Sequence, residues 1–136
     1  MSKGNTTEAD FIAFIFLATS MPSYGSNLYL ALYTSDPGEG GAPNNNECAY
    51  GGYTRVLVSR DAAGWDVSGN QADNFALLQF PEATGGTETA THVGIVTSAS
   101  GSSGQILYSG ALDANLNIST LIQPQFAAGA LIIQED

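Results

Sequence analysis

Few side chains in this sequence could carry out catalysis. The 136 residues include a single histidine, His92, and a single cysteine, Cys48. Zinc sites and the two-histidine, one-carboxylate iron site need more imidazole or thiolate ligands than these two residues supply. A Ser-His-Asp triad would depend on His92, which lies among apolar strand residues, and no G-x-S-x-G motif accompanies it. The inventory therefore predicts no catalytic site, no metal site and no cofactor, and the chain is not expected to be an enzyme.

The acidic residues are numerous, and their positions are typical of turns. Thirteen Asp and Glu side chains make some close carboxylate pair inevitable, so such a pair is no evidence for glycoside hydrolysis. Residues 36–47, DPGEGGAPNNNE, lack the spacing of a calcium-binding loop and begin with an Asp-Pro-Gly turn. Because a loop of this length is usually kept for binding, residues 36–52 and the N-terminal segment are predicted to dock onto a partner.

The net charge of −10 disfavours two classes of partner. Only Lys3, Arg55 and Arg60 oppose the acids. Nucleic acid binding depends on neutralising phosphates with Lys and Arg, and anionic membranes attract basic segments for the same reason. The sequence therefore predicts no nucleic acid partner and no membrane partner. The lone Cys48 allows no intrachain disulfide; a buried thiol is the favoured interpretation, and a disulfide between subunits stays open.

An apolar run, FIAFIFLA at residues 11–18, predicts a helix. It is far shorter than the roughly 20 residues that a membrane-spanning helix needs. Glu8 and Asp10, directly before the run, are unlike the basic start of a signal peptide. We expect an amphipathic or buried helix that ends near Ser20, with Thr7 and Asp10 as a capping pair.

Period-two alternation follows this helix and predicts strands. In residues 28–33 both faces are apolar or aromatic, so this strand should be covered on one side by the core and on the other by the helix or a neighbouring chain. Turn residues separate the segments and no helical pattern alternates with them, which favours an antiparallel sandwich or barrel. The other expected strands are residues 53–59, 75–80, 91–97, 105–112, 116–123 and 130–134. We expect residues 1–27 to form an N-terminal arm and residues 28–136 a β-sandwich domain.

Five stretches together resemble a known family. They are LYLALYTSDPGEGG, ECAYGGYTRVLV, FPEATGGTETATHVGIV, ILYSGAL and FAAGALII, and they occur in the family's order between Leu28 and Ile133. The sequence resembles small virion proteins of tailed bacteriophages, which include capsid decoration (cement) proteins and are often labelled as tail-fibre proteins. Cys48, Ala49 and Thr87 depart from the residue types expected at those positions.

The resemblance implies an all-β, jelly-roll-like antiparallel sandwich with a short N-terminal helix. It implies a homotrimer that is made in the host cytoplasm and sits on the outer capsid surface. There it would bind the major capsid protein and clip neighbouring capsid subunits together. A tail-associated module that binds a receptor or a carbohydrate is the alternative.

The candidate contact residues are of three kinds. Aromatic side chains near loops are of the type enriched in interfaces, although core packing would use them equally well. Acids of the long tract and the two arginines complete the set, with Arg55 or Arg60 paired to a carboxylate of a neighbour or of its own chain. The candidates are Phe11, Tyr29, Tyr33, Asp36, Glu39, Glu47, Tyr50, Tyr53, Arg55, Arg60 and Trp65.

Overall fold

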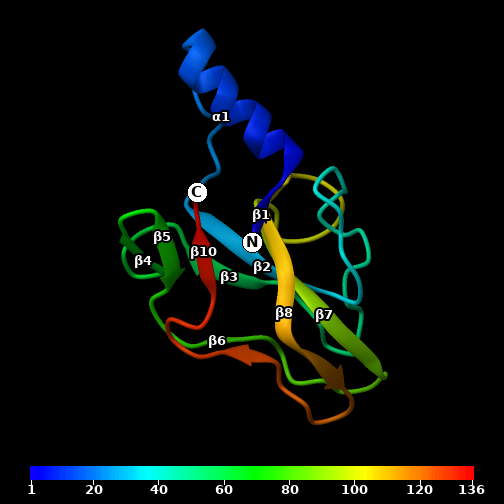
Figure 1. The fold of residues 1–136 in the computed structure, drawn as a ribbon. Coiled ribbons are helices and arrows are strands. Elements are labelled where there is room, and N and C mark those ends of the chain that lie inside the picture. Colours follow the sequence, from blue (N-terminus) through cyan, green and yellow to red (C-terminus); the bar gives the residue numbers. More distant parts are fainter.

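The computed structural model describes residues 1–136 and shows a β body from which one helix projects (Figure 1). The strands are short, apart from β7 and β8, and they are separated by turns and loops. In chain order the elements are β1 (Ser2–Lys3), α1 (Asn5–Leu17), β2 (Asn27–Tyr33), β3 (Val56–Ser59), β4 (Trp65–Ser68), β5 (Gln71–Asn74), β6 (Leu78–Gln79), β7 (Glu88–Val96), β8 (Ile106–Ile118), β9 (Gln125–Phe126) and β10 (Ile132–Gln134).

All strand pairs are antiparallel. The main sheet has the order β1-β8-β7-β2-β3, and two smaller sheets, β10-β5-β4 and β6-β9, pack against it. The turn between β7 and β8 contains Gly101 and Gly104 with φ angles of 72° and 82°, which glycine adopts without the Cβ clash of other residues. The expected all-β antiparallel sandwich with a short N-terminal helix is confirmed.

Strand β2 lies inside the main sheet because both of its faces are apolar. Leu30 and Leu32 enter the larger core, which also contains residues of β7 and β8 from the same sheet and which β6, β10 and the loops close on the other side. Ala31 and Tyr33 point to the opposite face and form a second, smaller cluster with Val96. Coverage on both faces is thus confirmed, but residues 36–47 cover the second face instead of the helix or another chain.

The sequence-based strand boundaries needed correction at several places. The strand expected at 53–59 begins only at Val56, and that expected at 75–80 shrinks to β6. The strand expected at 105–112 and the first three residues of that expected at 116–123 belong to one continuous strand, β8, whereas residues 119–123 are not in a strand. The hairpin β4–β5 was not expected, because its residues are mostly Asp, Asn, Gln, Ser and Gly, which have low β propensity. Pairing with β10 and a turn at Gly69 form it nevertheless.

Helix α1 is fixed at its first turns. The backbone N–H of Gly4 donates to Leu107 O at 3.0 Å, and the Thr7 hydroxyl donates to Ile106 O at 3.2 Å. The expected Thr7–Asp10 capping pair is wrong: the helix starts after Gly4 with no side-chain cap, and Thr7 is used to bind β8. The helix ends at Leu17, where Ala18 takes a left-handed conformation with φ of 53°. No helix of the chain has the length and apolar character to cross a membrane.

Candidate interaction surfaces

The fold separates the predicted contact residues into three groups. Tyr33, Tyr50 and Arg55 are buried within the chain. Tyr29, Glu47, Tyr53 and Trp65 are half-buried, and Phe11, Asp36, Glu39 and Arg60 are exposed. For the first group a surface position is therefore wrong, and core packing explains the side chains. The residues do not converge on one place.

Arg55 is the centre of an intrachain network. Its Nε and Nη2 donate to the two carboxylate oxygens of Glu47 at 2.7 and 2.8 Å. Nη1 donates to Ser98 O and Nη2 to Gly101 O, at 2.8 and 2.9 Å. Burial alone would lower the pKa of Arg55, but the hydrogen bonds and the charge of Glu47 outweigh it and raise the pKa. Of the two alternatives for Arg55, a carboxylate of a neighbour or one of its own chain, the second is therefore the one found.

The aromatic residues beside this network serve the core. The Tyr53 hydroxyl donates to Glu47 at 2.8 Å and accepts from the N–H of Leu32 at 3.1 Å. Its ring stacks on Phe80 with centroids 6.1 Å apart. The Tyr50 hydroxyl donates to Pro81 O at 2.7 Å, and burial, followed by the nearby Cys48 and Glu88, raises its pKa to about 12.

The long acidic tract is a folded cover and not a free arm. We call residues 36–47 the cover segment. Asp36 accepts from the N–H of Gly38 at 2.8 Å, and Asn45 and Asn46 donate to the carbonyls of residues 37 and 36. The Tyr33 hydroxyl donates to Pro43 O at 2.8 Å, and both prolines of the segment are fully buried. Only its outer positions, such as Glu39, are presented at the surface.

His92 takes a structural position. It lies half-buried in β7, opposite Tyr33 of β2 and Ala111 of β8. A ring nitrogen, Nδ1, is 2.8 Å from the hydroxyl of Thr91. No three His, Cys, Asp or Glu side chains come together as a set of metal ligands. Cys48 is a free, buried thiol, as expected.

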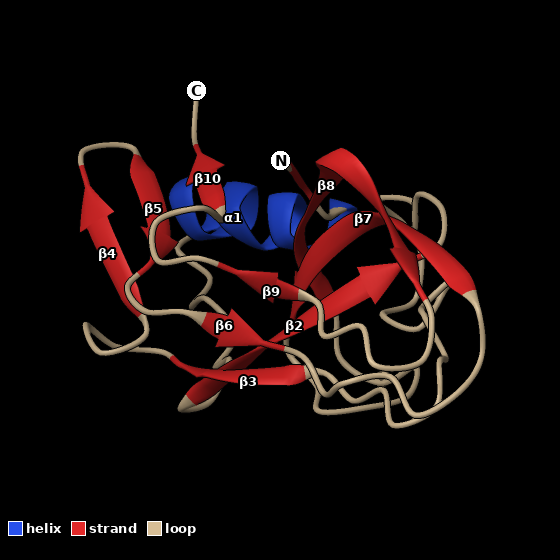
Figure 2. Cartoon of the chain, turned by 90° about the horizontal axis from the view of Figure 1, so that it is seen from below, coloured by secondary structure: helices blue, strands red, loops and turns tan.

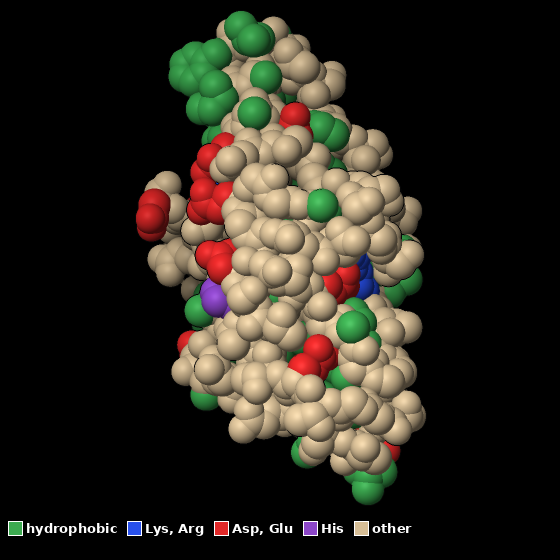
Figure 3. All heavy atoms as spheres, turned by 90° about the vertical axis from the view of Figure 1, so that its right-hand side faces the viewer, with side chains coloured by type: hydrophobic (Ala, Val, Ile, Leu, Met, Phe, Trp, Pro, Cys, Tyr) green, Lys and Arg blue, Asp and Glu red, His purple; other side chains and the backbone are tan.

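Helix α1 presents an unusual apolar surface. Six large apolar side chains on its last two turns and just before them are 44–75% exposed. They are Phe11, Ile12, Phe14, Ile15, Phe16 and Leu17, and we call them the α1 tip. Because they point in all directions around the helix axis, the expectation of an amphipathic or buried helix is wrong for the single chain. Figure 3 shows these hydrophobic side chains gathered at the end of the molecule that α1 forms.

A second set of exposed apolar side chains lies at the opposite end. Phe75 and Leu77 lead into β6, while Leu121 and Ile122 precede β9 and bond to the backbone of Ala83. We call these four residues the ribbon surface. Seen from below in Figure 2, β6 and β9 lie in front of the β body and α1 behind it. Leu121 has a φ of 74°, a left-handed conformation that costs a leucine energy.

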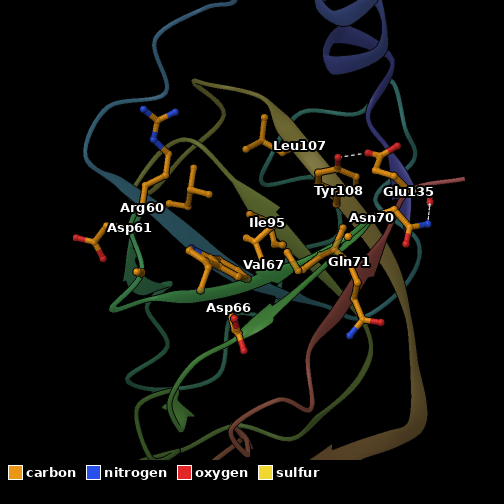
Figure 4. A pocket seen from close by; sticks show the side chains of 16 residues that line it. Arg60, Asp61, Asp66, Val67, Asn70, Gln71, Ile95, Leu107, Tyr108 and Glu135 are labelled. Atoms are coloured by element: carbon orange, nitrogen blue, oxygen red, sulfur yellow. Dashed lines mark hydrogen bonds between the residues drawn. The ribbon is translucent and has the colours of Figure 1, made fainter.

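An apolar groove opens between the main sheet and the hairpin β4–β5. It encloses about 670 Å³ and is lined by sixteen residues. Ile95, Leu107 and Ile133 form its floor, and Trp65 and Val67 line it from the hairpin. In Figure 4, Arg60 and Asp61 lie at one end and Tyr108 and Glu135 at the other.

The C-terminus closes one end of this groove. Lys3 donates to a carboxylate oxygen of Glu135 at 2.7 Å, and Tyr108 donates to the other oxygen. Asn70, from the β4–β5 turn, donates to the backbone carbonyl of Glu135. Of the groove residues, sequence reasoning singled out only Trp65 and Arg60, because the hairpin that forms one wall carries no strand signal.

Comparison with known proteins identifies a family. A family described as Podophage GP4 fiber I protein gp80 matches residues 2–134. No curated protein matches the chain. The match covers nearly the whole sequence and agrees with the resemblance to small virion proteins of tailed phages. The chain therefore belongs to the Podophage GP4 fiber I protein gp80 family and is a structural protein of a phage virion.

Proposed function

We propose that this protein is a non-catalytic capsid decoration subunit. As a homotrimer it binds the major capsid protein on the outer surface of the head and stabilises the assembled shell. The observation that carries the proposal is the presence of two exposed apolar surfaces, the α1 tip and the ribbon surface, at opposite ends of one β body (Figures 1 and 2). One surface can join copies to one another while the other contacts the shell.

The α1 tip needs a protein partner. A helix that is apolar on all sides is normally enclosed by other protein or by lipid, and α1 has 13 residues, about 20 Å, which is shorter than a bilayer core. Fully burying one such side chain is worth about 1.5–3 kcal/mol. With the exposed fractions given above, burying all six amounts to roughly 5–10 kcal/mol before the costs of association. Because association itself costs several kcal/mol, this amount holds an oligomer together only when the oligomer contains several copies of the contact.

The ribbon surface suits contact with a large, flat partner. Its four apolar side chains form two pairs at the two ends of the β6–β9 ribbon: Phe75 and Leu77 precede β6, and Leu121 and Ile122 are hydrogen-bonded to Ala83 beyond it. Exposed apolar side chains on one hydrogen-bonded ribbon are held in place and suit contact with a protein partner at two points. Phe75 and Leu77 are 60% and 49% exposed, which leaves most of their apolar area available.

The stabilising mechanism is thermodynamic linkage. A protein that binds only the assembled shell stabilises that shell in proportion to its binding free energy. A trimer carries three copies of each contact, so avidity makes a weak contact effective. The buried Glu47–Arg55 pair and the hydrogen-bonded cover segment keep the body stiff, so that little of this binding energy is lost in ordering the subunit.

A tail-associated fibre component is a second candidate. The description of the matching family, which names a fiber protein, favours it. Such a component would use the same two apolar surfaces, one for self-association and one for attachment, but its partner would be a tail or neck protein. Receptor or carbohydrate binding would then be expected at the exposed end.

Heads that lack this protein provide the test. Purified protein is mixed with such heads, and binding is measured by co-sedimentation and head rupture by light scattering during heating. We expect saturable, stoichiometric binding and a higher rupture temperature of decorated heads. Leu77→Asp together with Leu121→Asp should abolish both effects, while Ser102→Asp, an added charge in the β7–β8 turn, should leave them unchanged. Binding to tails but not to heads would support the fibre candidate instead.

A further inference from the structure

The groove beside β4–β5 is an unfilled part of the sandwich core. In a β-sandwich the inner faces of the two sheets interdigitate and leave few voids. Here Val67, which should pack against the main sheet, is 69% exposed, and about 670 Å³ remain open above Ile95 and Leu107. Trp65 lines the same space, and its buried indole N–H has no hydrogen-bond partner. The groove thus lacks apolar contacts on the side of the hairpin.

We infer that the α1 tip of a second copy of this chain fills the groove. This inference rests on the proposed homotrimer, but not on the identity of the virion surface that the trimer binds. It assigns an unpartnered apolar element of the chain to an unfilled apolar space of the same chain type. Residues Phe14, Phe16 and Leu17, which are 50–75% exposed, supply the side chains.

The helix cannot reach the groove of its own chain. Its base is bound to the main sheet through Gly4 and Thr7, and Gln105 donates to Thr7 at 3.1 Å. Its other end returns through residues 18–26 to β2. From this base α1 rises away from the body, whereas β4, β5 and β10 lie lower and to the side (Figure 1). Moving the tip into its own groove would break the contacts at the base, so the occupant comes from another copy.

The polar groups of the tip and of the groove also complement each other. The last four carbonyls of a helix have no helical donor, and at the end of α1 both following N–H groups, of Ala18 and Thr19, bond to Ala13 O instead. The last turn carries no basic side chain to offset the partial negative charge of these carbonyls. The groove offers one donor for these carbonyls, the guanidinium of the exposed Arg60.

The α1 tip brings no charged side chain to the groove. The acids of α1, Glu8 and Asp10, lie in its first half, so the tip adds no carboxylate to Asp61, Asp66 and Glu135, which line the groove. The contact joins two different surfaces of neighbouring copies. A contact of this type generates a closed ring when its rotation angle permits, and three copies would each give one helix and accept one.

Cysteine cross-linking of purified protein, without heads, tests the inference. Copies with Phe16→Cys are mixed with copies with Val67→Cys under oxidising conditions, and products are separated on a non-reducing gel. Mixed dimers between the two variants are expected, and the double variant should give covalent species up to a trimer. Cys48 is buried and serves as the internal control in unsubstituted protein, which should stay uncrosslinked.

Three outcomes would overturn the inference. Efficient dimers of Phe16→Cys alone would show that the helices bundle with one another. A fast-migrating monomer of the double variant would show that the helix folds into its own groove. Absence of any mixed product would show that tip and groove do not meet. Because heads are not used, none of these outcomes is confused with failure to bind the capsid.

A charge variant gives a second, independent readout. Leu17→Asp on the tip and Val67→Asp in the groove lie on exposed positions, so both should fold with an unchanged circular dichroism spectrum. Each should convert the oligomer to monomer in analytical ultracentrifugation, whereas Ser102→Asp should not. An oligomer that survives both substitutions contradicts the inference.

Discussion

Arg55 and Glu47 form a two-pronged ion pair inside the chain. The side chain of Arg55 is 1% exposed and that of Glu47 12%. Since Arg55 also donates to Ser98 and Gly101, the pair ties the cover segment to the turn between β7 and β8. These two segments lie beside the base of α1, where the backbone N–H of Asn5 donates to Glu39 O at 2.9 Å. The pair therefore supports the end of the body from which the helix projects.

Glu47→Gln should destabilise the protein strongly. The substitution keeps the shape of the side chain but leaves a buried guanidinium without its counter-charge, and removing one partner of a buried pair costs about 3–5 kcal/mol. Urea unfolding followed by tryptophan fluorescence measures the change in the free energy of unfolding. Glu39→Gln removes the same charge from an exposed position of the cover segment and should change stability by less than about 0.5 kcal/mol. Equal effects of the two substitutions would contradict the structural role of the pair.

The Cys48 thiol should not react in the folded protein. Burial raises its pKa to about 12, and the carboxylate of Glu88 acts in the same direction, so the reactive thiolate is scarce at pH 8. Labelling with a chromogenic disulfide reagent is expected to be slow in buffer and complete within minutes in denaturant. Stoichiometric labelling of the native protein at the rate of a free thiol would show that the core around Cys48 opens.

The C-terminal contact at Glu135 should make stability depend on pH. Partial burial is the largest single influence and favours the neutral acid, but hydrogen bonds from Lys3 and Tyr108 and the charge of Lys3 outweigh it and lower the pKa of Glu135. A carboxyl whose pKa is lowered by folding contributes stability above its unfolded pKa, and the contribution is lost as pH falls through the folded pKa. Because the side chain is 41% exposed, solvent screening limits the effect to about 1 kcal/mol or less.

Glu135→Gln tests this dependence. The variant should be less stable than the natural protein near pH 7, and the difference should vanish below about pH 4, where carboxylates become protonated. Thermal unfolding at a series of pH values gives the comparison. Asp136→Asn, the next carboxylate along the chain, should show no such pH-dependent difference. A constant gap between the curves of Glu135→Gln and the natural protein would argue against an ionic contribution.

The sequence predicted those parts of the fold in which local pattern and tertiary packing agree. Strands β2 and β7 alternate clearly, and their apolar residues pack as the alternation indicates. The hairpin β4–β5 was not predicted because its residues favour turns, and it is held in place by distant contacts, among them pairing with β10, about 60 residues away in the chain, and the hydrogen bond from the N–H of Leu131 to Asn74. The groove was not predicted either, because this hairpin forms one of its walls.

The candidate contact residues show a second limit of sequence reasoning. Alternation places Tyr33 on the face opposite Leu30 and Leu32, but it cannot tell whether solvent, another chain or a loop covers that face. Here the cover segment does, through Pro43, and Tyr33 is fully buried. Conversely, an apolar run such as residues 11–18 indicates that its side chains are buried. It does not indicate whether they are buried within their own chain or against another molecule. The exposed α1 tip can be recognised only once the rest of the chain is seen to leave it uncovered.

Leu121 is predicted to lower the free energy of unfolding of the subunit and to strengthen its binding to heads. Its left-handed backbone costs a leucine about 1–2 kcal/mol, and its side chain is 73% exposed, so it gains little from packing within the chain. Leu121→Gly removes the backbone strain and adds about 0.5–1 kcal/mol of entropic cost through the unfolded state. We therefore expect the free energy of unfolding in urea to stay the same or to rise by up to about 1.5 kcal/mol.

Binding to heads should respond in the opposite direction. If the ribbon surface contacts the shell, Leu121→Gly removes an apolar side chain that is held in position before binding, and co-sedimentation with heads should weaken measurably. Leu121→Ala provides the matched control, because it deletes most of the same side chain but keeps the Cβ that causes the strain. Both variants should bind heads more weakly, and only the glycine variant should gain stability, because alanine keeps the strain that the leucine already has. Undiminished binding by both variants would exclude Leu121 from the contact with the shell. The strained backbone at this position would then have no role in attachment.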